Sequence, residues 1–333
     1  MSFPGQRYLG PRPNTLIIAV CVLVALPVVL TRPVWTDSAV VLGVYALLGL
    51  SVGISYGQAG ILTMSQGAFA AIGGYAAAIL TTRFGWPPYA DLLVAMALPA
   101  ALAYGVARLV TRLSPLATAL ATLALGSVIE ILIRNADALT GGYIGLAGIP
   151  SVGAINTPAG YACLAWGMIV VTVFLYENLM CSAYGRALNV LRVDQARARA
   201  DGIDVPALMS AGFAVSAAVA GAAGWLYAHY ISFLSPESLD THISISALLM
   251  AVIGGAGYIL GPIVGTLLFD GLTRLMPAAE LQGFFYGAAL IIILLAARTG
   301  ILGLLAGLAR RLRRPDATPA PRAANLSPQE SLP

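Results

Sequence analysis

Long apolar runs recur along this chain, and they constrain its fold more than any other feature. Each run approaches the roughly 20 residues that an α-helix needs to cross a bilayer. Only 10% of the residues are charged, and the runs lack the polar–apolar alternation of a membrane β-barrel. The sequence therefore predicts an all-α polytopic membrane protein with about 10 transmembrane helices. The predicted spans are 14–31, 38–55, 60–82, 89–110, 115–133, 161–180, 207–231, 241–256, 258–273 and 283–300.

The arginines predict how these spans are oriented. All eighteen basic residues are arginines. With ten spans and a cytoplasmic N-terminus, fourteen of them fall on the cytoplasmic side, as the positive-inside rule favours. The four on the outside are Arg32, Arg83, Arg134 and Arg274. Reading 241–273 as one span would move the arginines of 310–314 outside, so we predict two short segments hinged at Gly254-Gly255-Ala256-Gly257.

Three regions follow from this topology. Residues 1–13 form a cytoplasmic N-terminal tail, and residues 14–305 form the transmembrane domain. Residues 306–333 are rich in Pro, Ala and Ser, which predicts a disordered cytoplasmic tail. Both termini are therefore expected in the cytoplasm.

One polar stretch, Arg186–Asp204, interrupts the apolar chain. It carries Arg186, Arg192, Asp194, Arg197 and Arg199, with Asp201 and Asp204. The pattern predicts a short helix that stops at Gly202, with Asp204 capping the next helix and Pro206 in its first turn. A helix charged on two sides has little to bury, so composition favours a solvated cytoplasmic loop over a surface for a partner protein.

A second polar patch, rich in glycine, lies between the second and third predicted spans. Gly57, Gln58, Thr63, Ser65 and Gln66 belong to it. Irregular backbone at membrane depth is tolerated where it is buried in protein or lines a cavity. We therefore consider the patch a candidate translocation path, with a simple cytoplasmic turn as the equal alternative.

The sequence lacks the residues that several kinds of chemistry would require. The chain has no lysine, so it cannot form a Walker A motif or a Schiff base. Cys21, Cys163 and Cys181 lack metal-ligand spacing, and His229 and His242 are too isolated for a metal or a proton relay. We predict no metal, no cofactor and no nucleic-acid partner. Glu130 and Arg134 are spaced for an ion pair, and the loop 134–160 is rich in turns.

Four blocks of the sequence resemble one family, the LivM-type inner-membrane permease subunits of branched-chain amino-acid ABC transporters. The blocks are GQAGILTMSQGAFAAIGGY at 57–75, ATLALGSVIEILIRN with TGGYIGLAGIP within 121–150, SAYGRALNVLRVDQARARADGIDVPALMS and its continuation at 182–236, and SALLMAVIGGAGYILGPIVG at 246–265. The resemblance implies a coupling helix in the loop 182–206 that docks on an ATPase subunit. Its contact residues would be Arg186, Arg192, Asp194, Gln195, Arg197, Arg199 and Gly202.

The resemblance also implies partners. These are a second permease of LivH type, two ATP-binding subunits of LivG and LivF type that bind ATP and Mg, and a periplasmic solute-binding protein, all at the bacterial inner membrane. Within the coupling loop, Gly202 matches the family's glycine, and Gln195 stands where the family often has Glu. Arg192 and Arg199 are expected to be the charged contacts to the ATPase.

The first block departs from the family, because Thr63-Met64-Ser65-Gln66 replaces the usual Ser-Leu-Gly-His. The expected solute is a branched-chain or related amino acid, with urea, amides or small aromatic acids as the alternative. An ATP-independent secondary transporter or channel is the alternative of a different class. The chain itself is expected to be non-catalytic.

Overall fold

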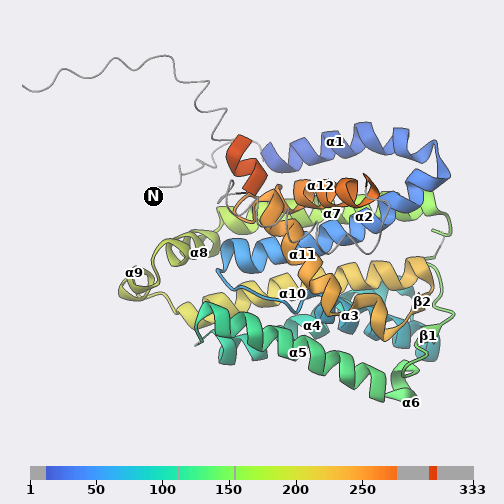
Figure 1. Ribbon diagram of the computed structural model, residues 1–333, viewed down its shortest axis with the longest axis horizontal. Coiled ribbons are helices and arrows are strands. Elements are labelled where there is room, and N and C mark those ends of the chain that lie inside the picture. The colour runs from blue at the N-terminus through green and yellow to red at the C-terminus, as the bar shows by residue number, and fades with distance from the viewer. Residues whose placement is uncertain (1–12, 112, 154, 276–299, 306–333) are drawn as a thin grey trace, which may run out of the picture.

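A computed structural model describes residues 13–111, 113–153, 155–275 and 300–305 as a helical bundle (Figure 1). The elements of the first half are α1 (Pro13–Leu30), α2 (Pro33–Val52), the π-helix η1 (Gly53–Gln58), α3 (Gln66–Phe84), α4 (Pro88–Val110), α5 (Pro115–Asn135), α6 (Asp137–Thr140) and β1 (Leu146–Ala147). Those of the second half are α7 (Pro158–Cys181), α8 (Ala183–Val193), α9 (Gln195–Ala200), α10 (Val205–Ile231), β2 (Phe233–Leu234), the 3₁₀ helix η2 (Pro236–Leu239), α11 (Thr241–Gly254) and α12 (Gly261–Leu275).

Helix α10 is the centre of the bundle and packs on α3, α4 and α2. Small residues allow its backbone to touch its neighbours, as helix packing in lipid requires. A Cβ on Gly224 would stand 1.8 Å from the carbonyl oxygen of Ala70 in α3. A Cβ on Gly221 would stand 2.1 Å from the carbonyl oxygen of Ala95 in α4. Small residues of α10 therefore allow its close packing against α3 and α4.

The predicted spans agree with the described helices in most cases. Within the described residues, six helices are long and apolar enough to cross a membrane: α1, α2 with η1, α4, α5, α7 and α10. Two predicted starts were wrong by five or six residues, because α2 begins at Pro33 rather than at residue 38 and α3 begins at Gln66 rather than at residue 60. Most of the predicted span 283–300 lies outside the described residues. The chain is thus an all-α polytopic membrane protein.

The segment 241–273 forms two short helices, as predicted. Helices α11 and α12 have 14 and 15 residues and are joined by a turn that begins at Gly255, whose φ of 105° favours glycine. They pack closely, since a Cβ on Gly254 would stand 1.8 Å from the carbonyl oxygen of Gly261. Pro262 of α12 lies against Gly53 of η1. The two helices therefore form a tight hairpin against α2.

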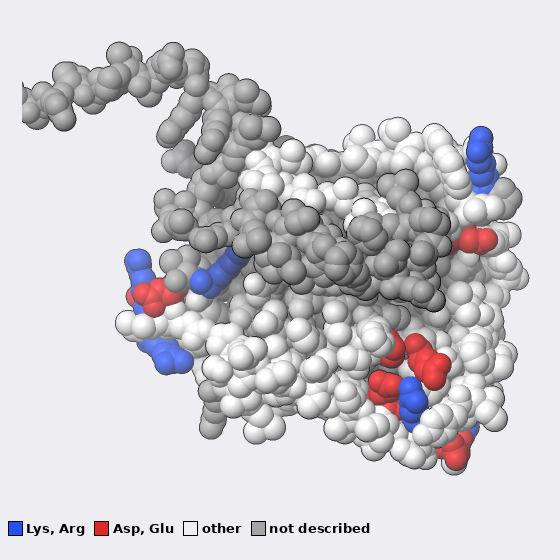
Figure 2. All heavy atoms as spheres, viewed as in Figure 1, with Lys and Arg blue, Asp and Glu red and all other residues white. Residues whose placement is uncertain are grey.

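The two ends of the bundle differ. At one end lie α8 and α9, and at the other lie α6 and the two-stranded sheet, in which Leu146 pairs with Leu234 (Figure 1). The loop beyond α5 contains several glycines with positive φ, so the predicted turn-rich loop is confirmed. Figure 2 shows charged side chains gathered towards these two ends of the visible face, and the described residues drawn between them are uncharged. This distribution suits a bundle that lies across a bilayer.

Candidate functional site

The polar glycine-rich patch lies where α2 ends. Its helix widens into η1, in which the amide of Ala59 donates to the carbonyl oxygen of Ile54 at 3.2 Å. Single π-turns of this kind interrupt helices and often occur at functional sites. The Tyr176 hydroxyl donates to the carbonyl oxygen of Gly53 at 3.3 Å, and residues 59–65 are not helical. Irregular backbone is therefore buried against protein, as membrane depth requires.

Gln66 is the hub of a buried hydrogen-bond network. Its amide nitrogen donates to Ser216 Oγ at 2.9 Å and lies 3.4 Å from Ser55 Oγ. Its amide oxygen accepts from Ser51 Oγ at 3.1 Å. Gln66 and all three serines are fully buried. This network joins α2, η1, α3 and α10 through a single side chain.

The other patch residues are also buried, but each has its own surroundings. Thr63 Oγ1 and Ser65 Oγ share a hydrogen bond of 2.9 Å. Gln58 is 4% exposed. A Cβ on Gly57 would stand only 1.9 Å from the carbonyl oxygen of Ala256, in the turn between α11 and α12. The structure thus places all five residues in the interior of the protein. Their role as a translocation path stays a prediction.

The charged stretch forms two helices rather than the single one predicted. Asp194 has extended backbone angles (φ −156°, ψ 110°) and separates α8 from α9. Its carboxylate accepts from the amides of Ala196 at 2.8 Å and Arg197 at 3.2 Å. The short aspartate side chain therefore satisfies the first turn of α9, and this local bond competes with a continuous helix. The predicted stop at Gly202 (φ 78°) and the cap of α10 by Asp204 are confirmed.

Apolar contacts attach this stretch to the bundle. Leu188, Leu191 and Ala198 are buried. The Tyr184 hydroxyl donates to the carbonyl oxygen of Leu208 in α10 at 2.7 Å. Burial raises the pKa of Tyr184 to about 12, so the hydroxyl stays a donor. We call α8 and α9 together the coupling segment, after the docking role that the family resemblance implies for this loop.

The charged side chains of the coupling segment point in different directions. Gln195, Arg197 and Arg199 are exposed on α9, and Arg186 Nη1 donates to the carbonyl oxygen of Cys181 at 3.2 Å. The guanidinium of Arg192 instead lies against Gly257 of the α11–α12 turn, with Nη2 2.8 Å from the position of a Cβ on that glycine. Arg192 is exposed like the charges of α9, but its guanidinium contacts its own chain, whereas the charges of α9 suit a partner surface.

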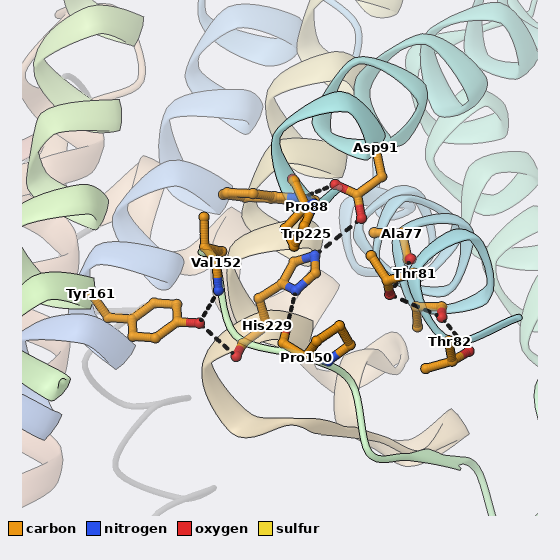
Figure 3. Close-up of polar contacts among 11 residues, drawn as sticks. Ala77, Thr81, Thr82, Pro88, Asp91, Pro150, Val152, Tyr161, Trp225 and His229 are labelled. Carbon is orange, nitrogen blue, oxygen red and sulfur yellow. Dashed lines mark hydrogen bonds and ion pairs between the residues drawn. The ribbon is translucent and has the colours of Figure 1, made fainter. Parts of the chain in front are cut away.

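A buried ion pair near the β1–β2 end was not predicted. Asp91 and His229 have fully buried side chains, and Asp91 Oδ2 lies 3.2 Å from His229 Nε2 (Figure 3). Trp225 Nε1 donates to Asp91 Oδ1 at 2.7 Å, and His229 Nδ1 lies 2.7 Å from the carbonyl oxygen of Pro150. The cluster ties the loop between β1 and α7 to α4 and α10. An acid inside a predicted span was the available signal for Asp91.

A second buried acid, Glu177, also lies inside a predicted span. It is 1% exposed, and its carboxylate accepts from the amides of Asn14 at 3.1 Å and Thr15 at 3.0 Å and from the Thr15 hydroxyl. Glu177 therefore caps the N-terminus of α1, where a negative charge is favoured.

The predicted Glu130–Arg134 pair is confirmed at 2.7 Å. Among the described residues, no three His, Cys, Asp or Glu side chains are grouped to hold a metal ion.

The helical bundle and its charged ends define the class as a multi-pass membrane protein, and sequence comparison gives the family. Residues 34–294 match the family described as "Branched-chain amino acid transport system / permease component", so the chain belongs to that family. It is similar to the LivM permease protein of Escherichia coli K12, at 28% identity over 90% of this chain and 79% of that protein. It is also 29% identical to LivM of Salmonella typhimurium LT2, over 73% of this chain and 63% of that protein.

A second group of relatives consists of LivH permease proteins. The LivH protein of Escherichia coli K12 is 26% identical over 78% of this chain and 91% of its own length. No solved structure matches the chain. The chain is therefore a LivM-type permease subunit of an ABC importer, and the similarity to both LivM and LivH indicates a permease pair.

Proposed function

We propose that this permease carries branched-chain or related amino acids across the bacterial inner membrane. In this proposal about ten spans cross the bilayer, both termini are cytoplasmic, and a LivH-type permease completes the pathway. A periplasmic binding protein delivers the solute at the β1–β2 end. Two ATPase subunits of LivG and LivF type bind ATP and Mg at the opposite end, and this chain holds no cofactor of its own.

The coupling segment is the observation that carries the proposal. It projects from one end of the bundle, with apolar side chains buried at its base and Gln195, Arg197 and Arg199 exposed on α9. A short cationic helix anchored in this way suits docking on a partner protein in water. The bond from Tyr184 to Leu208 connects the segment to α10, so that movement of the segment reaches the centre of the bundle.

The polar patch supports the proposed path. Gln66 and its serines form a buried polar group at the widened end of α2, where Ser55 belongs to η1. In the described conformation the amide of Gln66 bonds to the chain's own hydroxyls. Exchange of these bonds during the transport cycle would let polar groups of a solute replace them at little cost. The replacement of the family's Ser-Leu-Gly-His by Thr63-Met64-Ser65-Gln66 leaves urea, amides and small aromatic acids as alternative solutes.

Reconstitution tests the proposal. The chain is incorporated into liposomes with its partner permease, its two ATPases and its binding protein, and uptake of labelled leucine is followed with and without ATP. We expect ATP-dependent uptake and ATP hydrolysis that is stimulated by the loaded binding protein. Parallel assays with urea, an amide and benzoate identify the alternative solutes. Uptake by this chain alone without ATP would instead establish a secondary transporter or channel.

Docking is tested separately. Arg197→Ala with Arg199→Ala removes two exposed charges from α9 and leaves the buried base intact. We expect fewer ATPase subunits to co-purify with the permease pair at low salt, and a smaller difference from the wild type at high salt, where the exposed charges of the wild type are screened. Unchanged co-purification would exclude α9 as the docking helix.

A further inference from the structure

The guanidinium of Arg192 occupies the space that a side chain at position 257 would need. Nη2, Nη1 and Cζ lie 2.8, 3.5 and 3.6 Å from the position of a Cβ on Gly257. Arg192 lies in the last turn of α8, and Gly257 lies in the turn that follows α11. The C-terminal end of a helix carries partial negative charge and favours a cation nearby. The contact is therefore close, and it places a cation beside the turn that follows the C-terminus of α11.

The same turn is packed against the polar patch on its other side. The carbonyl oxygen of Ala256 lies 1.9 Å from the position of a Cβ on Gly57 in η1. Backbone thus meets backbone, with no flexible side chain between the turn and η1. Pro262 contacts Gly53 one turn earlier in η1. A displacement of the turn cannot be absorbed by side-chain rotation, so it must reach η1 or break the contact.

We propose that Arg192 is a positioning residue that links the coupling segment to the α11–α12 turn, and through that turn to the polar patch at Gly57. The inference rests on the proposed function, since it assumes that ATPase subunits move the coupling segment. It assigns different roles to two arginines of that segment: Arg199 faces the partner, and Arg192 faces its own chain.

The break at Asp194 makes this division of roles possible. Because the helix is interrupted there, α9 and its exposed arginines can contact a partner while α8 keeps its own orientation. Arg192 lies two residues before the break, on the α8 side. The planar, always charged guanidinium suits such a link better than a flexible ammonium group.

A double-mutant cycle tests the link in the complete reconstituted complex. Arg192→Ala removes the guanidinium, and Gly257→Ala displaces it by adding a Cβ. Gly257 is not among the described glycines with positive φ, and the atom that the new Cβ meets is the movable end of a side chain. Gly257→Ala is therefore expected to fold. The measured quantity is solute taken up per ATP hydrolysed.

We expect each single variant to lower this ratio by roughly two- to thirtyfold, the usual range for residues that carry coupling between sites. The double variant should be no worse than Arg192→Ala, because the guanidinium that Gly257→Ala displaces is already gone. Arg192→Lys should give a partial loss. A wild-type ratio in Arg192→Ala, or losses that multiply in the double variant, would overturn the proposal.

Arg199→Ala is the matched control, since it removes the same side chain from an exposed site on α9. Arg192→Ala should retain ATPase subunits as well as the wild type does on co-purification, whereas Arg199→Ala should not. Loss of those subunits in Arg192→Ala to the same extent would show that Arg192 is an ATPase contact instead, and would reject the link. If Arg199→Ala retains the ATPase subunits, the docking proposal fails. The amount of solute taken up per ATP hydrolysed by Arg192→Ala still tests the link between Arg192 and the α11–α12 turn.

Discussion

Replacing Asp91 with alanine tests how much the bundle depends on its buried ion pair. The substitution leaves His229 Nε2 without its acidic partner, in surroundings where both side chains are fully buried. Trp225 Nε1 keeps an acceptor, because the carbonyl oxygen of Pro88 lies 3.1 Å away. His229 is therefore the main residue that loses a polar partner in this variant. Removing one partner of a buried pair costs about 3–5 kcal/mol.

Asp91→Asn is the matched control. His229 Nδ1 lies 2.7 Å from a carbonyl oxygen, which can only accept, so this nitrogen carries a proton. The asparagine amide occupies the same position and keeps a polar contact with His229 Nε2, while its oxygen still accepts from Trp225. The expected cost is about 1 kcal/mol, the usual net value of one neutral hydrogen bond.

Thermal unfolding of the purified protein in detergent measures both variants. At about 2–4 °C for each kcal/mol, Asp91→Ala should lower the Tm by roughly 6–20 °C and Asp91→Asn by roughly 2–4 °C. Because His229 also bonds to Pro150, hydrogen exchange should rise at residues 149–152 in Asp91→Ala. The assignment of a stabilising buried pair would be refuted if the two variants had equal Tm values. It would also be refuted if Asp91→Ala lowered the Tm by less than about 2 °C.

Three further predictions concern packing, capping and pH. Gly224→Ala should lower stability by about 1–3 kcal/mol in thermal unfolding, because its Cβ would meet the backbone of Ala70, whereas Gly105→Ala has open space and should be neutral or stabilising. Glu177→Gln should lower the Tm through a loss of about 1 kcal/mol at the N-terminus of α1, and an unchanged Tm would contradict its capping role. The folded-state pKa of Tyr184 is raised to about 12, so its contribution to stability is present below about pH 10 and is lost as pH rises towards 12. The difference in Tm between wild type and Tyr184→Phe should therefore change only above about pH 10.

Local patterns determined the helices. Runs of apolar residues placed α1, α4, α5, α7 and α10 within a few residues of their observed bounds, because a membrane span is a property of one continuous segment. The two short helices within 241–273 also followed from local signals, namely the glycines of the hinge and the balance of charge across the membrane. Gly202 and Asp204 ended and began helices as their residue types predict.

The same local reasoning was wrong where two local preferences compete. Helical periodicity favoured one helix through Arg186–Asp204, but Asp194 bonds to the amides ahead of it and divides the stretch. Likewise the apolar content of 60–82 favoured a helix from its first residue, whereas the polar residues before Gln66 are not helical. Hydrophobicity alone does not reveal such side-chain bonds to backbone.

The sequence by itself determined that this chain is a helical membrane protein of a permease family, which segments are long and apolar enough to cross a bilayer, and where its charged and polar segments lie. Only the tertiary structure decided which of those residues meet. Gln66 with Ser216, Asp91 with His229, and Arg192 with Gly257 join segments far apart in the chain. Their contacts depend on how helices pack through small residues, and no periodicity within one segment encodes the partner that packing brings to it.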